Sequence, residues 1–166
     1  MSAFTIRASK PKDVAAIHSI HKAAFESETE ANLVRSLFED GDVVLSLVAE
    51  CGEQIVGSVI YSRLLIDGEN KRANALAPIS VLPERQSQGI GGALIGQAHA
   101  HLKAAGESLV FVLGDPAYYR RFGFSTESAS AFRTPYDGPY QMTLALDEDA
   151  AKSGIVTYPK AFAGLA

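Results

Sequence analysis

Three glycines lie close together in the segment VLPERQSQGIGGALI, residues 81–95. Gly89, Gly91 and Gly92 follow an apolar stretch and directly precede residues with helical periodicity. Glycines at such a place permit a sharp turn or let the backbone approach a ligand closely. Outward-pointing amides of the turn and of the first helical residues would form a concave site for phosphate or pyrophosphate, which the helix dipole favours. The alternative is a structural corner, in which the glycines only let the helix pack closely.

Two familiar phosphate-binding loops do not match this segment. The P-loop requires a lysine and a hydroxyl residue after its glycines, and neither follows them here. The dinucleotide fingerprint requires a third glycine where this chain has Leu94, and a place after the first strand of a βαβ unit. A phosphate site in this turn would therefore be of another kind.

The elements around the turn predict a mixed α/β fold in a single domain over residues 1–166. An S-x-x-E capping box at Ser27 and Glu30 is expected to begin the second helix, which ends at Gly41. In chain order we expect a strand at 4–8, helices at 14–25 and before Gly41, a three-strand meander at 43–50, 54–66 and 72–81, a helix from about 91 to 105, a buried strand at 108–113, a short helix from Pro116, and strands at 140–146 and 154–158.

Composition argues against two classes of partner, nucleic acids and membranes. The 166 residues are 47% apolar and carry a formal net charge of −4, which is typical of an ordered globular domain. Lysines and arginines are not clustered, so nucleic acid is not an expected partner. No apolar run approaches the ~20 residues of a membrane span, and the N-terminus lacks a signal-peptide pattern, so we expect a cytoplasmic protein without a membrane partner.

Cysteine and histidine do not indicate a metal or redox site. The single cysteine, Cys51, cannot form an internal disulfide. His18 and His21 are three residues apart on the first expected helix, but no third ligand accompanies them. We therefore expect no metal, and a partly exposed helix face at the two histidines.

The segment PISVLPERQSQGIGGALI resembles the acetyl-CoA-binding segment of the GNAT superfamily of N-acetyltransferases. The family signature [QR]-x-x-G-x-[GA] falls on Gln86, Gly89 and Gly91. Further along, AYYRRFGF matches the family element FYxxxGF at Tyr119, with Gly123 and Phe124. TEANLVRSL, VLGDPAYYRRFGF and YPKAF are similar to the YhbS-like branch of predicted acetyltransferases.

The resemblance implies a mostly antiparallel central sheet flanked by helices, with one splayed cofactor-binding strand. It implies acetyl-CoA as the acyl donor, with Tyr119 protonating the departing thiolate and a backbone amide near Val81 stabilising the oxyanion. A core tyrosine is the structural alternative for Tyr119. The residues implied to bind the cofactor are Ile79, Ser80 and Val81 along the pantetheine arm, and Gln86, Ser87, Gln88, Gly89, Ile90, Gly91 and Gly92 around the pyrophosphate.

Two positions depart from the family pattern. Many members have an asparagine near Asp115, so we expect this carboxylate to cap the following helix instead. The histone-acetylating branch has its general base where this chain has Ala75. Glu26, Glu28 and Glu30 lie in a region that helps line the acceptor groove in the family, but the capping box better explains Glu30 and a water relay is at least as plausible, so the base stays unassigned.

The implied function is an N-acetyltransferase that moves an acetyl group to a primary amine by direct transfer in a ternary complex. The amine belongs to an unidentified small molecule or peptide, and a homodimer is common for such folds. One alternative is a catalytically silent acyl-CoA-binding sensor or interaction module. Another keeps the fold but uses a longer acyl group or a hydroxyl acceptor.

Overall fold

The computed structural model describes residues 3–165. Its strands are β1 (Thr5–Ala8), β2 (Val43–Cys51), β3 (Gln54–Ile66), β4 (Glu69–Val81), β5 (Leu109–Leu113), β6 (Phe132–Arg133), β7 (Gln141–Ala145) and β8 (Gly154–Thr157). Its α-helices are α1 (Val14–Phe25), α2 (Thr29–Asp40), α3 (Ile90–Ala104), α4 (Pro116–Tyr119) and α5 (Thr126–Ala129). Short 3-10 helices are η1 (Pro11–Asp13), η2 (Pro83–Arg85), η3 (Arg120–Phe122) and η4 (Lys160–Leu165).

The central sheet has the strand order β1-β2-β3-β4-β5-β7. Each neighbouring pair along this path is antiparallel except β4 and β5, which are parallel. β8 adds to the end of β3 and pairs with β6. The predicted mixed, mostly antiparallel sheet is confirmed, while α5 and the two-residue β6 were not anticipated.

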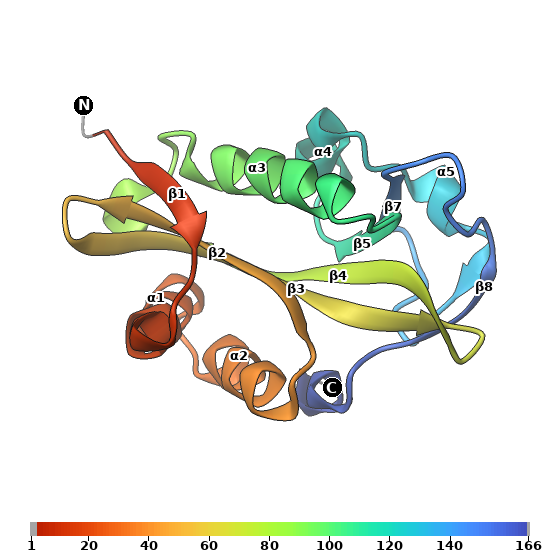
Figure 1. The fold of residues 1–166 in the computed structure, drawn as a ribbon, viewed down its shortest axis with the longest axis horizontal. Coiled ribbons are helices and arrows are strands. Elements are labelled where there is room, and N and C mark those ends of the chain that lie inside the picture. The colour runs from red at the N-terminus through yellow and green to blue at the C-terminus, as the bar shows by residue number, and fades with distance from the viewer. Residues whose placement is uncertain (1–2, 166) are drawn as a thin grey trace.

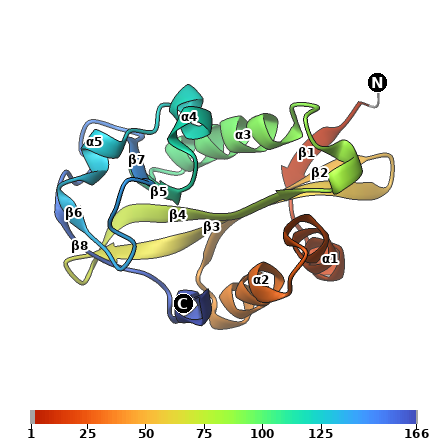
Figure 2. The same cartoon turned by 180° about the vertical axis from the view of Figure 1, so that it is seen from behind.

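Helices cover both faces of the sheet (Figures 1 and 2). α1 and α2 lie on one face, and α3 lies on the other, beside α4. Because successive strand residues point to opposite faces, Ile60 packs with Ile17 and Leu37 in one core cluster, and Tyr61 packs with Leu94 in the other. The sheet is therefore buried on two sides, as its apolar strands require.

The second helix does not begin with the predicted capping box. Its N-cap is Glu28, and the hydroxyl of Ser27 accepts the N–H of Thr29 at 3.1 Å and donates to Glu30 at 3.2 Å. Ser27 thus lies one residue before the N-cap, and the Glu30 carboxylate does not make the reciprocal backbone bond of a capping box.

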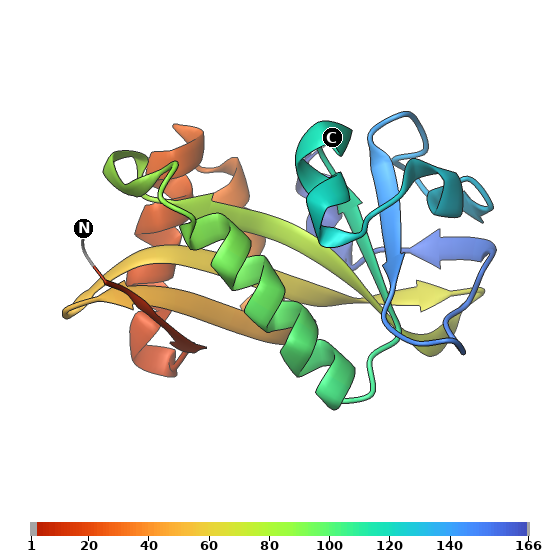
Figure 3. The same ribbon diagram turned by 90° about the horizontal axis from the view of Figure 1, so that it is seen from above.

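The main irregularity of the sheet is a fork between β4 and β5. The two strands pair only where Ala73, Asn74 and Ala75 lie opposite Leu109, Val110 and Phe111. Beyond Ala75, β4 continues to Val81 beside β3, whereas β5 stays with β7, and the strands run apart (Figure 3). A register shift in β4 places Ala77 and Pro78 opposite the single residue Ile60, and such a bulge bends its strand.

A buried carboxylate ties the strands together at the closed end of the fork. Glu107, two residues before the start of β5, has 4% side-chain exposure and accepts hydrogen bonds from Arg63 of β3 at 2.7 and 3.0 Å. Asn74 of β4 donates to the same carboxylate at 2.8 Å, and Arg72 Nε lies 3.3 Å from it. Burial opposes ionisation, but these hydrogen bonds and charges prevail and lower the pKa of Glu107.

Removing this charge should destabilise the fold. Glu107→Gln leaves Arg63 facing a neutral amide inside the protein, so we expect a loss of about 2–3 kcal/mol of unfolding free energy in urea at pH 7. Because the pKa is lowered in the folded state, this contribution is present above pH 4.5 and is lost as the pH falls through the folded pKa.

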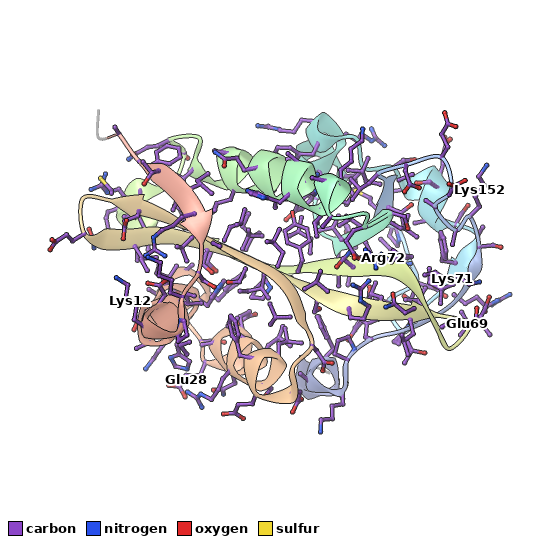
Figure 4. All side chains as sticks on the ribbon, in the orientation of Figure 1. Lys12, Glu28, Glu69, Lys71, Arg72 and Lys152 are labelled. Carbon is purple, nitrogen blue, oxygen red and sulfur yellow. The ribbon has the colours of Figure 1, made fainter. Side chains whose placement is uncertain are left out.

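The matched control is Glu28→Gln, which removes an ion pair with Lys22 on the outside of the two N-terminal helices (Figure 4). That pair is exposed on both sides, so its loss should change stability little. Equal effects of the two substitutions would contradict the structural role given to Glu107.

Candidate active site

The glycine turn lines a cavity of about 570 Å³, here called the glycine-loop cavity. Seven of the sequence-predicted binding residues line it together with three others. The seven are Val81, Gln86, Ser87, Gly89, Ile90, Gly91 and Gly92, and the others are Arg85, Tyr118 and Arg121. The structure therefore gathers most of the predicted cofactor residues around one hollow, while Ile79, Ser80 and Gln88 lie elsewhere.

The backbone of the turn presents N–H groups at the start of α3. Gly89 is the N-cap with φ +85°, a left-handed conformation that suits glycine. Helical hydrogen bonding begins with Ala93 N–H to Gly89 C=O at 3.1 Å. Among the described residues, the N–H groups of Ile90, Gly91 and Gly92 thus lack helical partners, and this is the arrangement that binds anions at helix N-termini.

Two arginines add positive charge to the glycine-loop cavity, and the sequence reasoning did not select either of them. Arg85 enters from η2, and the Arg121 guanidinium lies 4.7 Å from the ring centroid of Tyr118. Arg121 follows Tyr119 by two positions, so its place on the same short helical segment was the available signal. Together with the free amides, these cations give the cavity the chemistry of a phosphate site.

The two glutamines of the turn have different roles. Gln86 lines the cavity and its side-chain amide donates to the Val81 carbonyl at 3.0 Å. Gln88 lies outside the cavity lining and donates to the Glu84 carbonyl at 3.4 Å. Gln86 therefore connects the end of β4 to the turn.

A second cavity, here called the fork cavity, opens where β4 and β5 separate. Its volume is about 400 Å³. It is lined by Phe25, Glu30, Leu33, Ala75, Leu76, Ala77, Pro78, Ile79, Phe111, Leu113, Tyr119, Tyr136, Tyr158 and Phe162. Of these described lining residues, Glu30 alone is charged and six are aromatic, so the lining is mainly apolar.

Alternation along β4 decides which backbone groups face the fork. Leu82 N–H donates to Val56 C=O of β3 at 2.9 Å, and Ser80 lies opposite Ser58 in the same register. In an antiparallel pair every second residue bonds its neighbour, so the backbone groups of Ser80 face β3. Those of Ile79 and Val81 point the other way, into the space that β5 has left.

The side chain of Ser80 belongs to a buried polar network on the opposite face. His21 of α1 is completely buried, and its Nδ1 lies 2.5 Å from the Ser80 hydroxyl and its Nε2 3.1 Å from the Ser58 hydroxyl. The expected exposed face is therefore wrong for His21, which joins α1 to β3 and β4. Burial, with a smaller effect of His18, lowers the pKa of His21 to about 4, so its ring is neutral.

Consecutive tyrosines of α4 face the two cavities. Tyr118 lines the glycine-loop cavity, and Tyr119 lines the fork cavity. Asp115 is the N-cap of α4 and accepts the Ala117 N–H at 2.9 Å, so the predicted cap is confirmed. Gly114 is required for this arrangement, because an added Cβ would lie 2.5 Å from the Tyr119 ring. Burial, with a smaller effect of Tyr118, raises the pKa of Tyr119 to about 12.

Residues 5–126 match the model of the acetyltransferase (GNAT) domain. The chain therefore belongs to the GNAT family of acetyltransferases, and its class of activity is acyl-CoA-dependent N-acyl transfer. It is 35% identical over 162 residues to the uncharacterised N-acetyltransferase YhbS of Escherichia coli K12, an alignment that covers 95% of this chain and 97% of YhbS.

Two solved structures agree with this assignment. The E. coli YhbS structure in complex with CoA superposes with a TM-score of 0.92 at 33% identity, covering 98% of this chain and 93% of that one. A GNAT acetyltransferase from Brucella melitensis in complex with acetyl-CoA gives 0.84 at 37% identity, covering 98% and 99%. Within residues 3–165, no helix has the length and apolar character needed to cross a membrane.

The buried histidine should make stability depend on pH. Because the pKa of His21 is lowered on folding, the unfolded chain binds more protons between pH 6.5 and about 4, and stability is lost as the pH falls through this range. His99 behaves alike, since burial lowers its pKa to about 4. We expect His21→Asn to remove roughly half of the slope of unfolding free energy measured between pH 6.5 and 5.

The control for this measurement is His18→Asn, one turn away on α1, where the partly exposed ring contacts Arg35 at 2.7 Å. It should change the slope much less than His21→Asn does, because burial is the main cause of the lowered pKa of His21 and His18 has only a smaller effect. An unaltered slope in His21→Asn would show that the His21–Ser80–Ser58 network does not keep the ring neutral.

Proposed function

We propose that this enzyme transfers the acetyl group of acetyl-CoA to a primary amine by direct attack in a ternary complex. The observation that carries this proposal is the fork. Its exposed β4 edge, at Ile79 and Val81, lies between a cavity suited to phosphate and a cavity suited to an apolar acceptor. The two similar structures are complexes with CoA and with acetyl-CoA, which supports acetyl-CoA as the acyl donor.

The proposed cofactor follows β4 from one cavity to the other. The pyrophosphate accepts hydrogen bonds from the amides of Ile90, Gly91 and Gly92 and is paired by Arg85 and Arg121. The pantetheine amides bond the β4 edge as a further strand would, using the backbone groups of Ile79 and Val81. This path brings the thioester to the fork cavity beside Tyr119.

The chemistry then needs three contributions from the chain: a hydrogen-bond donor for the oxyanion, an acid for the departing thiolate and an acceptor for the proton of the amine. The amine nitrogen attacks the thioester carbonyl carbon, a C–N bond forms, and the oxyanion accepts a backbone N–H near Val81. The C–S bond breaks, and the thiolate, whose ordinary pKa is near 8.5, takes the phenolic proton of Tyr119. Since the pKa of Tyr119 is about 12, its hydroxyl is protonated at neutral pH and is regenerated from solvent.

The amine must lose a proton before or during attack. Ala75 cannot accept one, and Glu30 is the carboxylate that lines the fork cavity. Glu30 therefore receives the proton directly, or a water relay carries it out of the cavity.

Removing the phenolic proton should slow the chemical step. We expect Tyr119→Phe to lower kcat by about 100-fold with an accepted amine, while the Kd of acetyl-CoA stays within about twofold. The control is Tyr140→Phe, a tyrosine that is 61% exposed and outside both cavities. A kcat equal to that of the wild type would exclude Tyr119 as the acid that protonates the leaving group.

Cofactor binding tests the glycine-loop cavity separately. Acetyl-CoA and CoA at 100 times Kd should each stabilise the protein by ~2.7 kcal/mol in thermal unfolding. Arg121→Ala should weaken both by about tenfold, or ~1.4 kcal/mol, whereas Arg120→Ala removes an equal charge outside the cavity and should not. If Arg121→Ala and Arg120→Ala weakened CoA binding equally, Arg121 would act only through the net charge of the protein. If the wild type bound neither acetyl-CoA nor CoA, the proposed function would be contradicted.

A further inference from the structure

One wall of the fork cavity is built from aromatic side chains that the acetyl-transfer chemistry does not use. Tyr136 and Tyr158 meet edge to face with centroids 4.9 Å apart, and Tyr158 meets Phe162 at 5.1 Å. The Tyr136 hydroxyl donates to the Phe162 carbonyl at 3.4 Å. We call Tyr136, Tyr158 and Phe162 the aromatic wall.

The aromatic wall is a tertiary assembly beside the N-terminal helices. Tyr136 precedes β7, whereas Tyr158 and Phe162 belong to the C-terminal segment, which lies beside α2 (Figure 2). An ion pair between Lys160 of η4 and Asp40 of α2 at 3.7 Å joins the same two elements. Because the C-terminal segment lies beside α2, Glu30 of α2 lines the same cavity as the aromatic wall.

Apolar residues also line the cavity where it meets solvent. Phe25 at the end of α1 is 43% exposed, and Leu113 at the end of β5 is 42% exposed, and both line the fork cavity. Large apolar side chains that stay exposed at a concave site are typical of surfaces that bind an apolar ligand.

The charge in this cavity has one sign. Burial raises the pKa values of Tyr136 and Tyr158, so both hydroxyls remain neutral at physiological pH. Glu30 therefore supplies the charge among the described lining residues. A carboxylate beside aromatic rings attracts a single ammonium, by Coulomb attraction and by cation–π contact, and repels a carboxylate.

We propose that the acceptor is a primary amine on an aromatic body without a carboxylate, of the arylalkylamine kind. This inference rests on the proposed function and names its acceptor class. The aromatic body packs edge to face against the aromatic wall, and the amine lies at Glu30 and the thioester. The bound ammonium first gives one proton to Glu30 or to the water relay. The neutral nitrogen then gains the acetyl group and loses a second proton, while the CoA sulfur gains one, so that one proton is released overall.

A longer acyl chain on the donor would also fit an apolar cavity, but it would gain nothing from Glu30 and would remove that carboxylate from water. A polyamine would bring a second ammonium that has no second carboxylate among the described lining residues. The aromatic monoamine is the ligand that satisfies both the ring surfaces and the single charge.

Steady-state kinetics with acetyl-CoA on the wild-type chain provide the test. We expect kcat/KM for 2-phenylethylamine and tryptamine to exceed that for ethylamine, putrescine and free phenylalanine by at least about 100-fold. A preference for putrescine, ethylamine or phenylalanine would overturn the acceptor class and leave the proposed function standing. A higher rate with hexanoyl-CoA than with acetyl-CoA would also overturn it, because the cavity would then serve the acyl group.

Two pairs of variants locate the selectivity. Phe25→Ser should raise KM for 2-phenylethylamine at least about fivefold with little change in kcat, whereas Val14→Ser should not, being 39% exposed on the same helix but outside the fork cavity. Glu30→Gln should raise KM for 2-phenylethylamine about tenfold. Its control is Glu39→Gln, which removes a carboxylate of the same helix that does not line the fork cavity and should leave KM unchanged.

Titration of 2-phenylethylamine into the protein saturated with CoA gives a readout independent of turnover. Binding at saturating CoA, weakened by Phe25→Ser, supports the acceptor class even if catalysis is slow. Binding of acetyl-CoA without thiol release for any amine would instead contradict the proposed amine acetylation. Thiol release with ethylamine but no binding of 2-phenylethylamine would reject the aromatic acceptor alone.

Discussion

The parallel pairing of β4 with β5 stops after three residue positions, and the fork cavity depends on that interruption. A sheet that continued in register would satisfy the backbone groups of Ile79 and Val81 with β5 and would fill the fork cavity with packed strand. The bulge at Ala77 and Pro78 bends β4 away, and the Glu107 cluster keeps the strands together on the other side of the divergence. The bend in β4 therefore opens the fork, and the Glu107 cluster holds β3, β4 and β5 together at its closed end.

β4 is held differently on each of its sides beyond the fork. Its inner edge pairs with β3, and His21 reaches the Ser80 hydroxyl from α1. Its outer edge faces the space between the two cavities, where only the Gln86 side chain bonds the Val81 carbonyl among the described contacts. Since the strand is fixed on one side, its free N–H groups are pre-oriented, and binding a second extended chain requires little reorganisation.

Local sequence signals predicted the parts of the site that are made by contiguous residues. The glycine turn, the start of α3 and the Asp115 cap follow from residue types and spacing within short segments, whereas Tyr119 was selected through the resemblance to the family element. The burial of His21 and the bonds of Glu107 could not be predicted, because their partners are far along the chain and are brought together only by packing. Arg121 lies within the segment that resembles the family element, but the orientation of its side chain depends on the contact with the Tyr118 ring, which the sequence alone does not indicate.

The aromatic wall shows why acceptor chemistry is harder to predict than donor chemistry. Donor-side groups come from one strand, one turn and one helix start, whereas the fork cavity combines α1, α2, the segment before β7 and the C-terminal segment. No local pattern links Glu30 with Tyr158, because the contact between α2 and η4 brings their segments together. Substitutions in the C-terminal segment can therefore reshape the acceptor cavity while the glycine turn keeps its geometry. In the proposed function, the residues that hold the acyl donor are therefore separate from those that select its acceptor.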